Sequence, residues 1–397
     1  MDIKKIIEPV ARHFGTSVSD ILSSSRDGKI VTARHVAIYL SRSCFAASLS
    51  EATKAFNRPH VTILFAERKV RERMGSDEAF RVEVEKLHRE LEGREWFIMN
   101  FRRQPKGEAM IGAIVGDIVG SRFEFDNHKS KDFDLFVSCG KLNGSVDDNL
   151  KTMLNSSTYS DDSVMTLAIA KAILLWKEME SLTYQDLSQL AVASMREFGK
   201  MYPLAGYGGT FELWLQDETM GPYSSWGNGA AMRVSACGWA GLTLDEVKAM
   251  SRAVTEVTHN HPEGIKGAEA TAVATFLART GKSMSEIKEV VVRDYYPLGF
   301  TLDEIRPGYE FDVSCQGSVP PALEAFFEST SFEDALRNAI SIGGDSDTIG
   351  AICGAVAGAY YGVPDDIRTK AAAFLPSHLL KTLHSFESKF QCNYERN

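Results

Sequence analysis

Three acidic clusters, far apart in a chain of 397 residues, contain the side-chain types that bind divalent cations. The first is "GDIVGSRFE" at 116–124, the second is "YSDDSVMT" at 159–166, and the third is "GGDSDT" at 343–348. Neighbouring carboxylates raise one another's pKa unless a cation neutralises them. Serine and threonine hydroxyls stand beside these carboxylates. This all-oxygen donor set suits Mg²⁺, Mn²⁺ or Ca²⁺ better than zinc, and two converging clusters could hold two ions.

The same residues have a purely structural interpretation. Ser160 and Asp345 could be helix N-caps, and the carboxylates that follow them could be favourable charges in a first helical turn. For a single cluster this interpretation would be preferred. Three clusters in one region, with Asp-Asp and Asp-x-Asp-Thr spacing, favour a metal site.

Glycine-rich segments accompany the acidic clusters. The segments "YGGTF" at 207–211 and "SSWGNGAAMR" at 224–233 offer backbone N–H groups that no side chain obstructs, which suits a pyrophosphate. The segment "THNHPEGIKGA" at 258–268 adds His259 and His261 ahead of a predicted helix. Each histidine taken alone is more often structural than catalytic.

The region after Met110 is rich in glycine, alanine and aromatic residues, and its hydrophobic periodicity is helical. Strand signals are few, and only short pieces such as 133–137 look extended. We therefore expect an all-α region with several glycine-rich loops. The clearest helical stretches are 163–176, 187–198, 244–257 and 268–278.

The beginning of the chain is basic and has another pattern. Residues 1–108 carry 20 Lys and Arg against 15 Asp and Glu, whereas the whole chain has a net charge of −9. The segment "SLSEATKAFNRPHVTILFAERKV" at 48–70 predicts a helix over 49–56, a short break, and a second helix opened by Pro59. This is the layout of a helix-turn-helix, whose second helix enters the DNA major groove. The alternatives are a helical bundle with a solvated basic face and a module that binds a protein.

Other features limit the class of protein. The six cysteines are never within four residues of each other, so neither a zinc ribbon nor a CxxC redox motif is present. The first residues lack the apolar run of a signal peptide, and no window reaches the roughly 18 apolar residues of a spanning helix. We expect a cytoplasmic protein, with association with the nucleoid also open. Its predicted parts are a domain over 1–93, a linker over 94–108 and a domain over 109–397.

The segments "IVTARHVAIYLSR" and "SLSEATKAFNRPHVTILFAERKV" resemble the C-terminal DNA-binding domain of the bacterial replication initiator DnaA, over about Ile3 to Val70. That family normally has Arg-Asp-His-Thr-Thr at the start of the second helix, where this chain has Arg-Pro-His-Val-Thr at 58–62. The chain has no GxxxxGK[ST] motif, so it is not an initiator. The resemblance implies binding to double-stranded DNA, and the implied contact residues are Arg34, Arg58, His60, Thr62 and Lys69.

Six motifs in the rest of the chain resemble the ADP-ribosylglycohydrolase family, from about Met110 to Gly362. In order they are "GDIVGSRFE", "SDDSVMT", "WGNGAAMR", "THNHPEG", "FDVSCQGSVP" and "GGDSDTIGAICGAVAGAYYG". The resemblance implies an all-helical domain with a binuclear Mg²⁺ centre, for which Mn²⁺ is an alternative. The implied metal ligands are Ser160, Asp161, Asp162, Asp345, Asp347 and Thr348.

The same resemblance implies roles in breaking a glycosidic bond, which has an oxocarbenium-like transition state. Asp162 or Asp347 would help to activate the water. Glu124 would be a movable metal ligand or the acid and base at the leaving group. The residues implied to hold the substrate are Ser225, Trp226, Gly227, Asn228, Met232 and His259.

A glycine pattern suggests how the acidic clusters would meet. Gly350, Gly354 and Gly358 recur every fourth residue, so they lie along one helix face and would let another helix approach closely. Packed in this way, residues 345–348 at the start of the helix would meet residues 160–162 at the start of another.

The sequence therefore predicts an all-α protein with an N-terminal helix-turn-helix domain and an ADP-ribosylglycohydrolase-like domain. The predicted activity is Mg²⁺-dependent removal of ADP-ribose from a macromolecule. ADP-ribosyl-arginine on a protein is placed ahead of ADP-ribosylated DNA as the substrate. The alternative is a DNA-binding regulator whose hydrolase-like domain only senses ADP-ribose or a related nucleotide.

Overall fold

The structure is a computed structural model that describes residues 3–44, 49–77, 110–139, 155–179 and 183–391, with isolated positions at 80, 83–84, 86–87 and 152. The chain divides into two compact units, Met1–Arg102 and Arg103–Asn397. The predicted linker over 94–108 lies outside the described residues.

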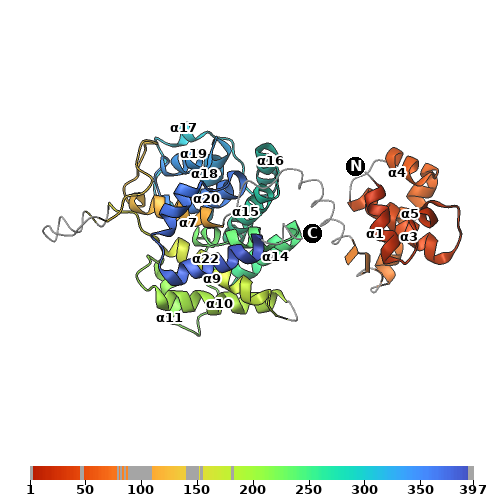
Figure 1. The fold of residues 1–397 in the computed structure, drawn as a ribbon, viewed down its shortest axis with the longest axis horizontal. Helices are drawn as coiled ribbons and strands as arrows, with labels where there is room; N and C mark the ends of the chain where they lie inside the picture. Colours follow the sequence, from red (N-terminus) through yellow and green to blue (C-terminus); the bar gives the residue numbers. More distant parts are fainter. Residues whose placement is uncertain are drawn as a thin grey trace. The chain divides into compact units, whose positions relative to one another are not determined.

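The N-terminal unit is helical (Figure 1) and has its own core of apolar side chains. This core includes Ile6, Ile21, Ile38 and Phe56, none of which is more than 1% exposed. The elements of the unit are α1 (Lys4–His13), α2 (Val18–Leu22), α3 (Gly28–Tyr39), the π-helical turn η1 (Leu40–Cys44), α4 (Leu49–Phe56) and α5 (His60–Ser76).

The helices α4 and α5 form the predicted helix-turn-helix. Between them Asn57 has a φ of +48°, a left-handed conformation that asparagine adopts more readily than most residues. Pro59 has a φ of −59°, which its ring favours, and it precedes the first residue of α5. Phe56 and Ile63 are buried on either side of this turn, so apolar packing holds the two helices together.

The C-terminal unit is an all-α domain. Within its described residues the one β pairing is an antiparallel bridge between Gly227 and Ser314, and the segment 133–137 lies in no strand. No helix in the described part of the chain has both the length and the apolar character needed to cross a bilayer. The elements of the unit are α7 (Ile111–Gly120), η2 (Ser121–Phe123), α9 (Asp161–Trp176), α10 (Tyr184–Met201), α11 (Gly209–Gln216), α12 (Gly229–Met232), α13 (Ser235–Ala240), α14 (Leu244–Thr255), α15 (Pro262–Arg279), α16 (Met284–Asp294), α17 (Leu302–Ile305), α18 (Cys315–Phe327), α19 (Phe332–Ile340), α20 (Ser346–Tyr361), α21 (Asp365–Ala372) and α22 (Ser377–Gln391).

The helices α7 and α20 lie side by side in this unit (Figure 1), and α20 also contacts α15, α18 and α19. Glycines permit the close approach of α7 and α20. A Cβ atom added at Gly112 would overlap the carbonyl oxygen of Gly354, and one added at Gly116 would overlap that of Gly350. The predicted glycine face of α20 is therefore in contact with a second glycine face, that of α7.

This packing brings several helix starts together. Asp345 occupies the N-cap position of α20, and Asp347 lies in its first turn. Ser160 is the N-cap of α9, and its side chain accepts a hydrogen bond from the backbone N–H of Asp162. Both helix starts lie against α7 or the η2 turn that follows it. The fold thus positions two short acidic segments that are almost two hundred residues apart in the sequence.

Candidate metal and substrate site

A cleft of about 550 Å³ lies at these helix starts. It is lined by residues from every motif that the sequence suggested for metal and substrate binding, and "FDVSCQGSVP" contributes Phe311 and Val313. Ser160 lies directly before the lining residue Asp161 as the cap of α9. The other predicted site residues that line the cleft are Glu124, Asp162, Ser225, Trp226, Gly227, Asn228, Met232, His259, Asp345, Asp347 and Thr348.

Three carboxylates crowd one part of the cleft. Glu124, Asp345 and Asp347 each place one oxygen within 4.8 Å of the other two. Burial, with the negative charges of Asp345 and Asp117, raises the pKa of Glu124 to about 7. Burial and neighbouring carboxylates also raise the pKa of Asp347 well above its usual value. Like charges this close are stable only if protons or cations neutralise them.

The first turns of α9 and α20 touch in the cleft. The hydroxyls of Thr348 and Ser160 lie 3.3 Å and 3.4 Å from the same oxygen, Oδ2 of Asp162. The other oxygen of Asp162 is buried and has no hydrogen-bond partner among the described residues. A buried carboxylate oxygen without a partner is destabilising, and a cation would satisfy it. The residues present therefore fit Mg²⁺, which prefers oxygen ligands.

Asp117 is a site residue that sequence reasoning missed. It is completely buried in α7 and accepts hydrogen bonds from the backbone N–H groups of Ser160 and Ser163, both at 3.0 Å. It also accepts from the Ser160 hydroxyl at 2.7 Å and from the Ser163 hydroxyl. Asp117 thus orients the start of α9. The sequence signal was a charged residue inside the otherwise apolar stretch 111–119.

The loop before α12 is fastened to the acidic residues. Nδ2 of Asn228 donates to Oδ2 of Asp345 at 2.6 Å and to the Ser318 hydroxyl at 2.9 Å. The backbone N–H of Asn228 donates to the carbonyl oxygen of Val313 at 2.7 Å. The ring of Trp226 is 52% exposed and is therefore accessible to a planar ligand. This loop is held in place before any ligand arrives.

Burial sets the charge of His259, and its hydrogen bonds indicate which ring nitrogen carries the hydrogen. Nη2 of Arg233 donates to the Thr258 hydroxyl at 2.7 Å and lies 3.4 Å from Nδ1 of His259. The Thr258 hydroxyl lies 2.8 Å from the same Nδ1. Burial, and then the charge of Arg233, lowers the pKa of His259 well below its usual value. The imidazole is therefore neutral, and an Nδ1 that accepts from these donors leaves Nε2 with the hydrogen, beside the loop at 227–229.

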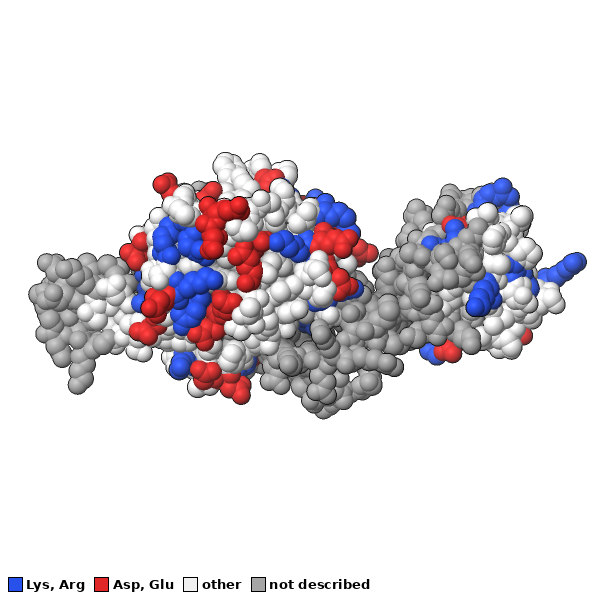
Figure 2. Space-filling model, turned by 90° about the horizontal axis from the view of Figure 1, so that it is seen from above, with Lys and Arg blue, Asp and Glu red and all other residues white. Residues whose placement is uncertain are grey.

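The residues predicted to contact DNA differ in their exposure to solvent. His60 and Lys69 are exposed on α5, while Arg58 and Thr62 are half-buried. Beside them, on the same helix, the apolar side chain of Val61 is 78% exposed. On the face drawn in Figure 2, the described charged side chains of the N-terminal unit are mostly basic, whereas those of the C-terminal unit include both signs.

Arg34 lies in the interior of the N-terminal unit, with 6% of its surface exposed. Its guanidinium donates to the carbonyl oxygens of Ile21 at 2.6 Å, Ser25 at 3.0 Å and Asp20 at 3.1 Å. These bonds tie α3 to α2 and to the residues that follow it. Arg34 therefore has a structural role in the described conformation, and its contact with DNA stays a prediction.

Comparisons with known proteins agree with this division. Residues 106–388 match the sequence model of the ADP-ribosylglycohydrolase family, and residues 3–70 match that of the bacterial dnaA protein helix-turn-helix. Over 91 residues the chain is 42% identical to the chromosomal replication initiator protein DnaA of Bradyrhizobium sp. (strain ORS 278), which covers 23% of this chain and 19% of that protein.

The larger unit has relatives among eukaryotic proteins. The chain is 27% identical over 343 residues to ADP-ribosylhydrolase ARH3 of Homo sapiens, covering 69% of this chain and 91% of that protein. It is 26% identical over 343 residues to the Mus musculus protein of the same name, covering 69% and 90%. A solved ADP-ribosylglycohydrolase-related protein complex aligns with 73% of this chain and 96% of its own, at 22% identity and a TM-score of 0.47. Since the family model matches well over half of its length, the chain belongs to the ADP-ribosylglycohydrolase family.

Proposed function

We propose that the C-terminal unit is a Mg²⁺-dependent hydrolase that removes ADP-ribose from a macromolecule. The observation that supports this most directly is the convergence of Glu124, Asp162, Asp345 and Asp347 at one end of a cleft. Burial raises the pKa values of all four carboxyl groups, and the negative charges of neighbouring carboxylates raise them further. Two divalent cations would relieve this repulsion.

The proposed metal ligands are the predicted ones. When bound, the two ions would grip the ribose hydroxyls and polarise the attacking water. A carboxylate beside that water, Asp162 or Asp347, would accept its proton. Asp117 would keep the start of α9 in position throughout, because it bonds Ser160 and Ser163 directly. The ligands are Ser160, Asp161, Asp162, Asp345, Asp347 and Thr348.

Glu124 would act at the leaving group. Its pKa of about 7 lets it be either protonated or ionised near neutral pH, which is the condition for an efficient general acid. It lies in the turn after η2, in contact with the cleft rather than within a helix. This setting is also compatible with the movable metal ligand that the family resemblance implies.

The rest of the cleft suits the ADP part of the substrate. The helix α11 begins at Gly209 with Gly208 as its N-cap, and both glycines line the cleft. The backbone N–H groups of this helix start would bind the diphosphate. The Nε2–H of His259 supplies a further donor next to Gly227. The exposed ring of Trp226 would stack on the adenine.

The decisive experiment replaces one carboxylate without changing its size. Asp345→Asn should abolish Mg²⁺-dependent release of ADP-ribose from modified proteins, and Asp365→Asn, an exposed residue in the first turn of α21, should have no effect. Undiminished release by Asp345→Asn would overturn the metal assignment. A wild-type chain that binds ADP-ribose but releases none from arginine-, serine- or DNA-linked conjugates would instead be the sensor.

We further propose that the N-terminal unit binds double-stranded DNA and directs the hydrolase to substrates on the chromosome. Its likeness to the DnaA helix-turn-helix supports this, as do the exposed His60 and Lys69 on α5. The linkages under consideration are ADP-ribosyl-arginine on protein and ADP-ribosylated DNA. Duplex binding that weakens steeply with salt is expected, since phosphate contacts release counterions.

A further inference from the structure

Two identical triplets meet at the mouth of the cleft: residues 124–126 and residues 310–312 both read Glu-Phe-Asp. We call these six residues the EFD rim. The rings of Phe125 and Phe311 stack with their centroids 5.8 Å apart and their planes 28° apart. Phe125 is 83% exposed and Phe311 is 48% exposed, and Phe311 lines the cleft together with Glu124. Such an exposed aromatic pair beside a cleft indicates a binding surface.

Hydrogen bonds hold the two halves of the EFD rim together. Nζ of Lys129 donates to the carbonyl oxygen of Tyr309 at 2.6 Å and to that of Ile342. Oδ1 of Asn127 accepts from the backbone N–H of Gly344 at 3.1 Å. The rim is therefore fixed to the segment that carries Asp345, and little ordering is needed when a ligand binds.

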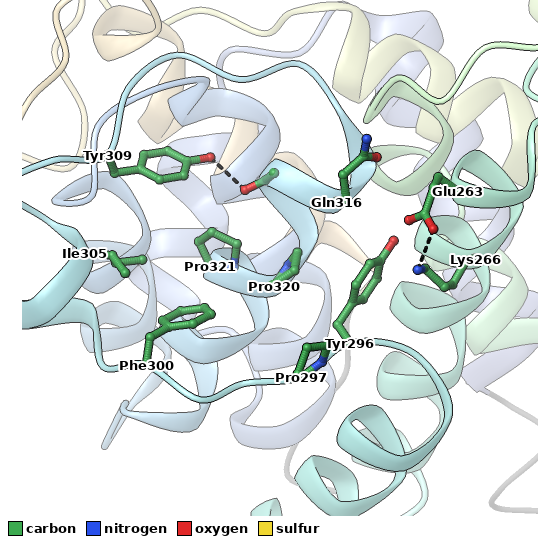
Figure 3. Close-up of a pocket in the computed structure, with 11 residues that line it drawn as sticks. Glu263, Lys266, Tyr296, Pro297, Phe300, Ile305, Tyr309, Gln316, Pro320 and Pro321 are labelled. Carbon is green, nitrogen blue, oxygen red and sulfur yellow. Dashed lines mark hydrogen bonds and ion pairs between the residues drawn. The ribbon is translucent and has the colours of Figure 1, made fainter.

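The second triplet is anchored from behind as well. There the Tyr309 hydroxyl donates to the carbonyl oxygen of Gly317 at 2.9 Å (Figure 3). A second cavity of about 590 Å³ lies beside this bond, and Figure 3 shows the side chains that line it. The two charged side chains in that cavity pair with each other, because Nζ of Lys266 donates to Oε1 of Glu263 at 2.6 Å. This cavity is therefore close to neutral.

The EFD rim, in contrast, contains four acidic side chains and no basic one. Asp126 and Glu310 are exposed, and neither forms an ion pair within 4.0 Å in the described part of the chain. Lys129 interacts electrostatically with Glu310, and its hydrogen bonds go to two carbonyl oxygens. Asp312 accepts a hydrogen bond from the backbone N–H of Ser314 at 2.7 Å. Aromatic faces beside several carboxylates attract a planar cation.

We propose that the EFD rim is the binding site for the leaving group and that it selects a guanidinium, so that the substrate is ADP-ribosyl-arginine. This inference rests on the proposed function. The guanidinium stays planar and cationic when one nitrogen is bonded to ribose. It would stack on Phe311 next to Glu124, the proposed acid at the leaving group. A serine leaving group is neither planar nor charged, and a neutral nucleobase is planar but carries no charge.

The test compares two peptides of the same sequence, one ADP-ribosylated on arginine and one on serine, with the full chain. Phe125→Ala and Phe311→Ala should each raise the KM for the arginine peptide about two- to fivefold with a much smaller change in kcat, as one exposed cation–π contact predicts. Phe311→Tyr keeps a ring and should restore the KM. Leu242→Ala removes a side chain that is 66% exposed outside the cleft and serves as the matched control.

The carboxylates are tested separately from the rings. Asp126→Asn combined with Glu310→Gln should lower the ratio of kcat/KM for arginine over serine, and it should make the KM of the arginine peptide less dependent on salt. An equal loss on both peptides in the ring variants would overturn the proposal. Faster release from an ADP-ribosylated oligonucleotide than from the arginine peptide would also overturn it.

A binding measurement separates this inference from the proposed hydrolysis. The affinities of both peptides are measured for the inactive Asp345→Asn chain and again after Phe311→Ala is added. If the arginine peptide binds more tightly than the serine peptide and Phe311→Ala removes the difference, the proposed role of the EFD rim is supported. This holds even if the wild-type chain releases no ADP-ribose, because a lack of release would contradict only the proposed hydrolysis. Equal affinities for the two peptides would overturn the proposed role of the EFD rim, whether or not the wild-type chain hydrolyses either peptide.

Discussion

Asp117 accepts four hydrogen bonds from Ser160 and Ser163, and none of its surface is exposed. Asp117→Asn keeps the size of the side chain but turns one acceptor into a donor that faces other donors. Residues that orient metal ligands typically contribute roughly 10- to 100-fold to metal affinity. We therefore expect the variant to need roughly 10- to 100-fold more Mg²⁺ for half-maximal activity, measured by titrating Mg²⁺ into the hydrolysis assay.

Asp245→Asn is the control for that measurement, since Asp245 is exposed in the first turn of α14, away from the cleft. Its Mg²⁺ requirement should match that of the wild type. If Asp117→Asn lowered the maximal rate at saturating Mg²⁺ and left the Mg²⁺ requirement unchanged, Asp117 would not act through the metal ligands.

The raised pKa values predict how Mg²⁺ should stabilise the protein. Glu124 has an ordinary pKa of 4.5 and a pKa of about 7 in the fold. Its contribution to folding stability is therefore complete below the ordinary pKa and is lost as the pH rises through the folded pKa. The pKa values of Asp161, Asp162 and Asp347 are raised in the same direction. Without metal, the protein should lose stability as its carboxyl groups ionise.

Mg²⁺ should reverse this loss, because it binds the ionised carboxylates of the folded state. The increase in Tm on adding Mg²⁺ should thus be larger at about pH 8 than at about pH 5. Thermal unfolding in EDTA and in Mg²⁺ at the two pH values measures it. Glu124→Gln removes one titrating group, so its metal-free Tm should fall less over the same range. An equal increase in Tm at both pH values would contradict the proposed site.

At the level of residues, the sequence predicts those site residues that belong to a recognisable local pattern. Asp161, Asp162, Asp345 and Asp347 were recognisable because they stand in pairs beside hydroxyl residues at expected helix starts. Asp117 stands alone in an apolar helix, and its partners Ser160 and Ser163 lie more than forty positions away. Such a role depends on how α7 packs against α9, which no local pattern contains.

The contact between α7 and α20 is the element on which the site depends most. A methyl group at Gly116 would overlap the backbone of Gly350 and Ala351, where no flexible side chain can move aside. Gly116→Ala should therefore reduce the free energy of unfolding by about 1–3 kcal/mol or more, measured by urea denaturation. It should also weaken Mg²⁺ binding, because α20 carries Asp347 and Thr348 at its start.

Gly299→Ala is the matched control for this helix contact, since a Cβ atom at Gly299 would have no neighbour within 4 Å. It should change the free energy of unfolding by less than about 1 kcal/mol. Equal stability of the two variants would mean that α7 and α20 are not packed as closely as described.

The elements themselves were largely predictable, and their ends less so. The stretch 163–176 became α9 over Asp161–Trp176, and 268–278 became part of α15, which Pro262 opens with His261 as its cap. The segment 133–137 lies in no strand, and residues distant in the sequence bond its backbone groups. Nη1 of Arg337 in α19 donates to the carbonyl oxygen of Phe133, and the backbone N–H of Val137 donates to the Ser157 hydroxyl.

For the whole molecule, the division into two units separates two kinds of chemistry. The N-terminal unit has its own core and exposes basic side chains on α5, and the C-terminal unit contains the acidic cleft. The proposed DNA-binding unit would raise the local concentration of the hydrolase near a DNA-bound substrate without altering the cleft. DNA binding should therefore affect the rate on a DNA-bound substrate and not the rate on a free peptide.

This separation can be tested with His60→Ala combined with Lys69→Gln in the full chain, since both residues are exposed on α5 and outside the core. The variant should bind duplex DNA more weakly, and the slope of log affinity against log salt should become shallower by about 1, as expected when one phosphate contact is lost. Release of ADP-ribose from a short arginine peptide should stay at the wild-type rate. With an ADP-ribosylated DNA-bound protein at concentrations below its KM, the rate should fall roughly tenfold or more, and addition of high salt should bring the wild type down to the variant. Equal rates of the two chains on the DNA-bound protein at low salt would show that the N-terminal unit does not direct the hydrolase to DNA.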